Sequence, residues 1–154
     1  MEHFHYGLVV DDIERAMAEY AAALGLTWAD VATRAVRVAG ADGGEPVDAV
    51  LLATYSRQGP PYVELIQDVR GGVWSGASRL DHIGYWVPDL AEGLAGLEAS
   101  GFTASVQAVD GDGRPTRFGY RRPPSGTGPW IELVDLAVRP QLLAWIEGGG
   151  YDVR

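Results

Sequence analysis

Apolar and polar positions change their spacing along the chain in a regular order. Residues 4–10 alternate within an apolar run, which predicts a strand. Asp12 then precedes apolar side chains three and four positions apart, and Gly25 follows them, so a helix is expected between these two residues. Three strand-like stretches follow, at 26–39, 47–55 and 61–67. The first half of the chain therefore predicts the element order βαβββ.

The same order recurs in the second half of the chain. Segment 5–13 (HYGLVVDDI) aligns without gaps on 82–90 (HIGYWVPDL), and 61–66 (PYVELI) aligns on 129–134 (PWIELV). Two matching pairs in the same order indicate a duplicated module. A second helix is expected between Asp89 and Gly101, with strands at 82–87, 102–109, 115–122 and 129–135.

The repeat predicts a single α+β domain over residues 1–154, made of two tandem βαβββ modules. The expected parts are a first module at 3–68, a linker at 69–79, a second module at 80–136 and a helical tail at 137–154. The tail has no counterpart in the repeat, and the sequence leaves open whether it caps the site or joins a dimer.

Composition narrows the chemistry that such a domain can perform. The chain has 12 basic residues, all arginine, against 21 acidic ones, and its formal net charge is −9. The absence of cysteine excludes disulfides and thiolate metal sites, so any metal must bind to His, Asp, Glu or backbone oxygen. The acidic balance argues against nucleic acid as a partner, and no apolar run is long enough to cross a membrane. We expect a cytoplasmic protein that acts on a small molecule.

Strand alternation places four ionisable side chains on one face of the predicted sheets. If Tyr6 and Leu8 face the module's helix, His5 faces the opposite side, and the same rule applies to His82. Two glutamates alternate with apolar residues in their own strands, and a buried carboxylate is costly unless it is paired or bound to a metal. The predicted ligands of a divalent metal are His5, Glu64, His82 and Glu132. This set suits zinc, nickel, cobalt, manganese or iron(II).

His3 is an alternative metal ligand, because it has the same strand parity as His5. Only His5 matches the repeat, so His5 is the preferred assignment.

Other side chains are expected to contact a substrate. Three aromatic residues share the faces of the predicted ligands: Tyr62, Trp86 and Trp130. When strand 116–122 is shifted by 68 positions onto the first module, Phe118 and Tyr120 face the helix, and the residues that face the site are Arg117, Gly119 and Arg121. Arg121 could then bind a substrate carboxylate or phosphate, although a solvated arginine at a strand end is the alternative.

The sequence resembles the vicinal oxygen chelate superfamily, which includes glyoxalases, bleomycin-resistance proteins and extradiol dioxygenases. The motif H-x-G-x-x-V-x-D-[IL] occurs at 5–13 and 82–90, and the E-L strand occurs at 64–65 and 132–133. The similarity is greatest to glyoxalase I-like and methylmalonyl-CoA epimerase-like members. It implies that the paired modules form a cup-shaped, curved mixed sheet around a divalent metal, with the same four ligands.

The resemblance also implies a class of reaction. A metal that polarises a substrate carbonyl, together with a nearby carboxylate that moves a proton, gives isomerase, epimerase or lyase chemistry. Glu132 is the expected base, and Glu64 is its symmetric alternative. Two other functions stay open: a non-catalytic protein that binds an antibiotic or aromatic ligand and, with less support, an extradiol-type dioxygenase. A homodimer is expected, and the site could form within one chain or across the dimer.

Overall fold

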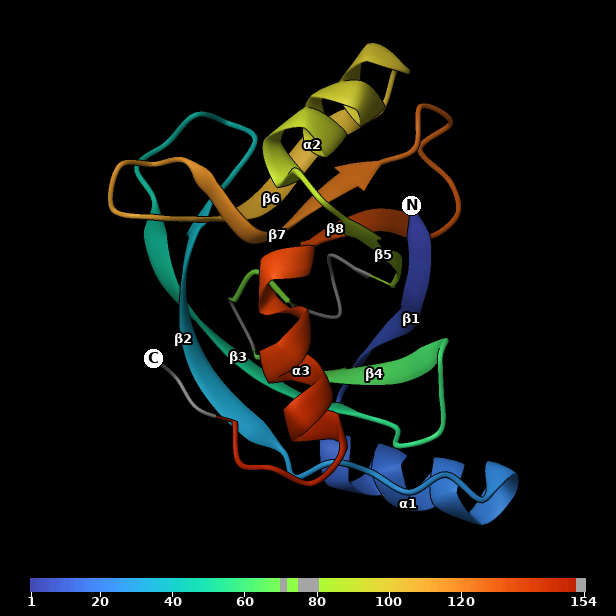
Figure 1. Ribbon diagram of the computed structural model, residues 1–154. Helices are drawn as coiled ribbons and strands as arrows, with labels where there is room; N and C mark the ends of the chain where they lie inside the picture. Colours follow the sequence, from blue (N-terminus) through green and yellow to red (C-terminus); the bar gives the residue numbers. More distant parts are fainter. Residues whose placement is uncertain (70–71, 75–80, 152–154) are drawn as a thin grey trace.

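The computed structural model describes residues 1–69, 72–74 and 81–151 (Figure 1). The first βαβββ unit consists of β1 (Glu2–Val10), α1 (Ile13–Leu24), β2 (Ala32–Ala39), β3 (Val47–Tyr55) and β4 (Tyr62–Gln67). The second consists of β5 (His82–Val87), α2 (Leu90–Ala99), β6 (Thr103–Val109), β7 (Pro115–Arg122) and β8 (Trp130–Asp135). A short 3-10 turn, Leu136–Val138, leads into α3 (Arg139–Ile146). The predicted α+β class and the duplicated element order are confirmed.

The two module helices begin where the sequence predicts. The side chain of Asp12 accepts a hydrogen bond from the Arg15 amide, and Asp89 does the same for the amide of Glu92. Gly25 ends α1 in the left-handed conformation, with φ of 69°.

One predicted strand is shorter than expected. The strand predicted at 26–39 begins only at Ala32, because the residues before it cross the end of β3 instead of continuing the sheet. Ala29 lies at this crossing, where its amide donates to the carbonyl of Tyr55 and its own carbonyl accepts from the Thr54 hydroxyl.

The strands form one closed barrel in the order β1-β4-β3-β2-β6-β7-β8-β5. Each unit contributes four adjacent strands, and the two units meet at two seams. At one seam, β1 pairs antiparallel with β5 over most of its length. At the other, β2 pairs with β6 only at Val38↔Ala108 and Ala39↔Gln107. The second seam is therefore the weakly closed side of the barrel.

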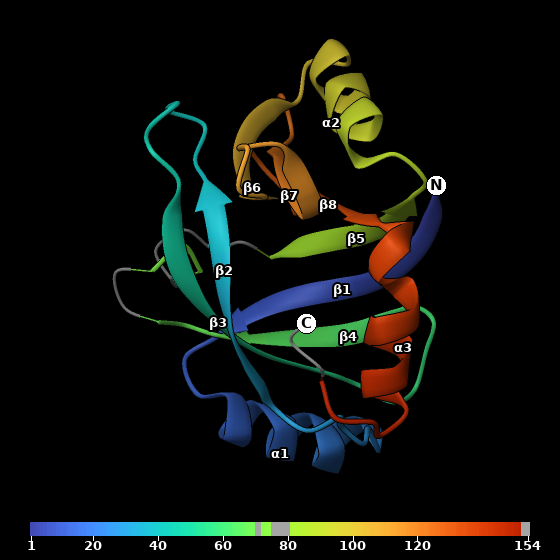
Figure 2. The same cartoon turned by 60° about the vertical axis from the view of Figure 1, so that its left-hand side comes forward.

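Helices cover the barrel from outside and at its mouth. Figure 1 shows α1 and α2 on the outer surface at opposite ends, and α3 across the front of the barrel. In Figure 2, α3 stands beside the ends of β1 and β4. The interior core contains residues of both units. Three buried side chains of α3 also belong to this core: Leu142, Trp145 and Ile146. The tail thus covers the interior of its own chain, which is one of the two roles left open by the sequence.

Most of the predicted linker, 69–79, lies outside the described residues. Trp74 is described, and its ring is 1% exposed and packs in the interior core. Its indole N–H donates to the hydroxyl of Tyr120 over 3.4 Å. None of the helices in the described part of the chain is long and apolar enough to span a membrane.

Candidate metal centre

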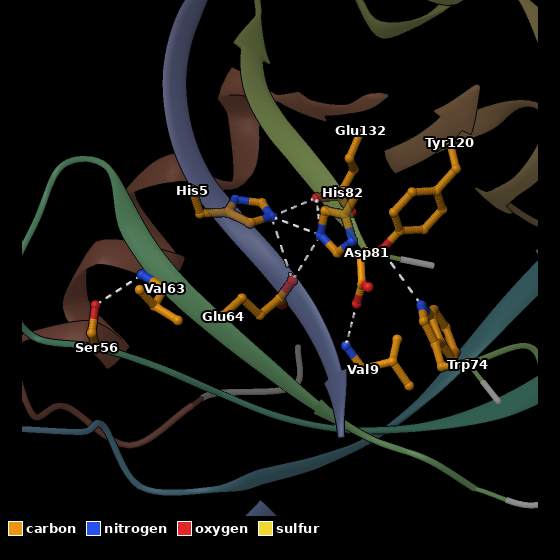
Figure 3. A network of polar contacts seen from close by, with 10 residues as sticks. All are labelled: His5, Val9, Ser56, Val63, Glu64, Trp74, Asp81, His82, Tyr120 and Glu132. Carbon is orange, nitrogen blue, oxygen red and sulfur yellow. Dashed lines mark hydrogen bonds and ion pairs between the residues drawn. The ribbon is translucent and has the colours of Figure 1, made fainter. Parts of the chain in front are cut away.

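The side chains of His5, Glu64, His82 and Glu132 meet inside the barrel (Figure 3). They come from the four neighbouring strands β1, β4, β5 and β8, which belong to both units. All four are buried, and one nitrogen or oxygen atom of each lies within 4.8 Å of the others. The structure therefore brings together the four residues that strand alternation places on one face.

Two glycines make this meeting possible. In the pairing of β1 with β5, His5 lies opposite Gly84 and His82 lies opposite Gly7. A Cβ atom on Gly7 would lie 1.9 Å from Cε1 of His82, and one on Gly84 would lie 2.2 Å from Cε1 of His5. The glycine of each H-x-G motif therefore leaves the space that the histidine of the other motif occupies.

The spacing of the donor atoms fits a divalent cation. His5 Nε2 lies 3.0 Å from His82 Nε2 and 2.9 Å from Glu132 Oε2, and the distance from His82 Nε2 to Glu64 Oε2 is 3.1 Å. Two ligands that are each about 2.1 Å from a metal and about 90–110° apart are separated by about 3.0–3.4 Å. Glu132 Oε2 is buried, and its near neighbours are the Nε2 atoms of His5 and His82, at 2.9 Å and 3.5 Å. Buried carboxylate oxygens that face imidazole nitrogens at these distances are what a bound cation would satisfy.

The electrostatics of the cluster lead to the same conclusion. Burial by itself lowers the pKa of His5, but the contacts with Glu132 and Glu64 outweigh it and raise this pKa to about 9. Burial raises the pKa of Glu64, and its contacts with His5 and His82 reverse this and hold the pKa well below its usual range. Without a metal, the two carboxylates therefore retain a proton on a histidine. A divalent cation supplies the same positive charge and displaces that proton.

Two tyrosines that the sequence analysis missed complete the cluster. Tyr55 on β3 lies opposite Glu64 in the strand pairing, and Tyr120 on β7 lies opposite Glu132. Burial, and after it the charges of the two glutamates, raise the pKa of both tyrosines well above its usual value. Their hydroxyl groups therefore stay protonated and can donate hydrogen bonds. The sequence could have identified these tyrosines by their equivalent positions in the repeat, near the end of the strand that precedes each glutamate strand.

A cavity of about 140 Å³ adjoins the cluster. Its walls include both glutamates and both tyrosines of the cluster, together with parts of β2, β7 and α3. Polar side chains, among them Arg34 and Arg117, and apolar ones make up the rest, and the larger apolar members are Val36, Leu51, Phe118, Val134, Val138 and Leu142. A cavity of roughly 150 Å³ can hold a benzene-sized molecule. The cavity can therefore enclose a small ligand next to the cluster, but it is too small to enclose a large one.

The sequence profile of the Glyoxalase/Bleomycin resistance protein/Dioxygenase superfamily matches residues 4–120. The chain belongs to this superfamily. The match runs from β1 to the end region of β7 and includes three of the four clustered residues, with Glu132 beyond it. The resemblance inferred from the motifs is confirmed, and so is the glyoxalase/bleomycin resistance fold.

Solved structures with this superfamily fold are similar over most of the chain. Methylmalonyl-CoA epimerase from Streptomyces coelicolor, in complex with 2-nitronate-propionyl-CoA, is 15% identical, with a TM-score of 0.57 over 88% of this chain and 96% of that chain. The Mycobacterium tuberculosis epimerase is 20% identical, with a TM-score of 0.51 over 87% of each chain. A hypothetical protein from Bacillus halodurans is 16% identical, with a TM-score of 0.55 over 87% and 93%. No protein of curated function matches the sequence. At these identities the likeness shows the fold alone.

Within the superfamily fold, the prediction that Arg121 faces the cup is wrong. Its guanidinium lies on the outer side of the barrel, with Nη2 2.7 Å from Glu98 Oε1 of α2 and 3.0 Å from Gln107 Oε1. The prediction shifted this strand by 68 positions, whereas the residue equivalent to Tyr55 is Tyr120, which follows it by 65 positions. Tyr120 precedes Glu132 by 12 positions, whereas Tyr55 precedes Glu64 by 9, so the two shifts differ by three, and an odd difference exchanges the two faces of a strand.

His3 lies apart from the cluster. The pairing of β1 with β5 is irregular between His3 and His5, so the two histidines do not share one face. The ring of His3 packs against Tyr6 and Tyr85 instead, with centroid distances of 4.7 Å and 5.3 Å. His5 is thus the histidine of this strand that the fold brings to the cluster.

The three aromatic residues expected to bind substrate lie outside the lining of the cavity. Trp86 faces the interior, but it is packed in the core with its ring 4.1 Å from that of Phe4. Tyr62 and Trp130 are half-buried at the first positions of β4 and β8. Their role in substrate binding stays a prediction, and the cavity is lined by other residues.

Proposed function

We propose that this protein is a divalent-metal-dependent enzyme that moves a proton next to a carbonyl group of a small substrate. The reaction class is isomerase, epimerase or lyase. The observation that carries the proposal is the buried cluster of two histidines and two glutamates beside a cavity. Zinc, nickel, cobalt, manganese and iron(II) all suit these donors. When bound, the metal supplies a Lewis acid that polarises a substrate carbonyl.

Glu132 is the proposed proton acceptor, and Glu64 is its symmetric alternative. Both carboxylates line the cavity, so both can reach a substrate. Oε2 of each glutamate contacts both histidines: that of Glu132 lies 2.9 Å from His5 Nε2, and that of Glu64 lies 3.1 Å from His82 Nε2. The contacts of Glu64 with the two histidines hold its pKa well below its usual range, which makes Glu64 the weaker candidate for the base.

Tyr55 and Tyr120 are proposed to orient the reacting groups. Each is buried and protonated, and each adjoins one of the two glutamates. A tyrosine hydroxyl here can donate to a glutamate or to a substrate oxygen and so fix the direction of proton transfer. Apolar side chains nearby, such as Val36 and Leu142, lower the local polarity, which strengthens these contacts.

The first test is the metal content of the protein and of its His82→Ala variant. About one divalent ion per chain, lost in the variant, is the expected result. Metal-loaded protein is then incubated in D2O with thioesters and α-keto hemithioacetals, and deuterium incorporation next to the carbonyl is followed by NMR. Glu132→Gln is expected to slow this exchange by about 10²–10⁴-fold, more than Glu64→Gln does. Glu14→Gln, a change on the exposed side of α1, is the matched control.

Two results contradict the proposal. One is a protein that binds no divalent metal even after reconstitution. The other is metal-loaded protein that catalyses exchange in none of these compounds.

The aromatic lining of the cavity favours a second candidate, a protein that binds a small aromatic ligand without converting it. Tyr55, Phe118, Tyr120 and Tyr151 contribute to this lining. Quenching of tryptophan fluorescence by an aromatic compound, with no exchange or turnover, is the result that this candidate predicts.

We propose that the site forms within one chain, because all four clustered residues meet in a single copy of it. The expected homodimer stays a prediction, which light scattering on the purified protein can check.

A further inference from the structure

Two arginines line the cavity without a carboxylate partner. They are Arg34 on β2 and Arg117 on β7, and both belong to the same lining as Glu64 and Glu132. Among the residues that the structure describes, no carboxylate lies within ion-pair distance of either guanidinium. Five other arginines of this acidic chain do pair with carboxylates. Of the four described arginines without such a partner, two therefore line the cavity, although acidic residues outnumber basic ones in the chain.

Arg34 is held over the cavity by aromatic rings. The carbon at the centre of its guanidinium lies 4.4 Å from the ring centroid of Tyr151 and 5.3 Å from that of Trp145. Its Nε atom is buried and, within the described residues, donates no hydrogen bond. Stacking leaves the edge of the planar group, where its N–H donors lie, free for an acceptor. Burial without an acceptor is costly, so a ligand at this edge would satisfy a donor that the protein leaves unused.

Arg117 reaches the cavity through a strained backbone. Phe118 and Tyr120 line the interior, so regular alternation would send Arg117 to the outer face of β7. Its φ is 61°, the one positive φ of a non-glycine residue among the described residues, and this conformation is disfavoured by its Cβ. The left-handed turn breaks the alternation, so Arg117 and its neighbour both line the cavity. Strain of this kind is typical of functional positions.

Tyr151 links the two arginines. Its hydroxyl accepts a hydrogen bond from Nη1 of Arg117 over 3.2 Å, and its ring lies under the guanidinium of Arg34. One residue of the C-terminal tail therefore contacts both cations.

We propose that Arg34 and Arg117 together bind the carboxylate of an acidic substrate, whose other end reaches the cluster of histidines and glutamates. This substrate class rests on the proposed function of that cluster. A carboxylate accepts two parallel N–H bonds from a guanidinium, and it is smaller than a phosphate, which suits a cavity of about 140 Å³. The substrates are small organic acids with a further carbonyl or hydroxyl oxygen for the metal.

Two hydroxamates of equal size test this proposal on the metal-loaded protein. Both bind divalent metals through neighbouring oxygens. The monohydroxamate of succinic acid carries a free carboxylate at its other end, and the hydroxamate of succinamic acid carries a neutral amide there. Calorimetry is expected to show at least about tenfold tighter binding of the acid, which is the size of effect that a charged hydrogen bond gives.

Three variants test which residues cause the tighter binding of the acid than of the amide. Arg34→Gln and Arg117→Gly are each expected to reduce this preference for the acid to less than about threefold. Arg117→Gly also removes the disfavoured left-handed conformation of a residue with a Cβ, so this variant is expected to fold at least as well as the parent. Arg114→Gln, at an exposed arginine that pairs with Asp112 ahead of the same strand, is the control and keeps the full preference.

The outcomes separate this proposal from the proposed function. Equal binding of acid and amide by metal-loaded parent protein overturns the arginine site and leaves the metal site intact. Parental preference in both cavity variants overturns it as well. If the parent binds no metal, the proposed function fails. Succinate is then compared with succinamide by tryptophan fluorescence, and equal binding overturns the arginine site too.

Discussion

Single residues decide whether the four donor atoms can meet. His5 and His82 each need space on the opposite strand, and only glycine supplies it at both places. The sequence shows these glycines as part of a repeated motif. Their reason becomes visible only when β1 and β5 are paired, because each glycine serves the other module's histidine. The motif could therefore predict which residues cluster. The reason for its glycine could be found only from the structure, which shows how the residues of β1 and β5 pair.

Gly84→Ala tests this requirement. The added Cβ would lie 2.2 Å from the His5 ring, so the ring must move. We expect metal affinity to fall at least about tenfold, since displacing one of four ligands removes a large part of the binding free energy. Gly96→Ala on α2 is the matched control, because its added Cβ has no neighbour within 4 Å. Titration with a divalent metal measures both, and unchanged affinity in Gly84→Ala would show that the ring is not a ligand.

The pKa of His5 gives a second prediction at this scale. In metal-free protein this pKa is about 9, above the ordinary value of 6.5. The contribution of His5 to folding stability is therefore complete below pH 6.5 and is lost as pH rises through 9. Metal binding needs the neutral ring, so apparent metal affinity should rise by about tenfold per pH unit between pH 7 and 9. Calorimetry in buffers with different ionisation enthalpies should detect about one released proton, and a flat affinity profile would contradict this assignment.

At the scale of elements, strand alternation assigns side chains to the correct face only where the alignment of the two modules is correct. The faces of β1, β4, β5 and β8 follow from two ungapped motif pairs, and the structure confirms them. The face of β7 was carried across a loop of different length and came out reversed. This reversal hid Tyr120, and it placed Arg121 in the cup. A strand without its own motif cannot be assigned to a face from a neighbour unless loop lengths match.

Arg121 therefore has a structural role, which can be measured. Its buried guanidinium joins α2 to the sheet through Glu98 and Gln107, with a further hydrogen bond to its own strand. Arg121→Ala is expected to lower the free energy of unfolding by about 1–3 kcal/mol, because Gln107 and the strand carbonyl lose a charged partner. Metal affinity and hydroxamate binding should stay unchanged. Denaturant unfolding gives the first quantity, and Arg15→Ala, at an exposed arginine on α1, is the control.

For the whole molecule, the tail is what the repeat could not predict. The sequence offered two roles for α3, and the structure shows it covering the interior of its own chain with Leu142, Trp145 and Ile146 buried. Tail residues then help to define the cavity, because Leu142 and Tyr151 are part of its lining. A segment without a counterpart in the repeat has no symmetry to fix its position, so its packing depends on the three-dimensional shape of the cup.

The proposed metal would stabilise the fold as a whole, since its ligands lie on β1 and β4 of one unit and on β5 and β8 of the other. A ligand that binds only the folded protein, at a hundredfold excess over its dissociation constant, stabilises it by about 2.7 kcal/mol. For a chain of this size, that corresponds to a fall in Tm of about 5–10 °C when the metal is removed by a chelator. The fall should be absent in His82→Ala, whose Tm should not respond to added metal. A chelator effect of equal size in both proteins would place the stabilising cation elsewhere than between the two units.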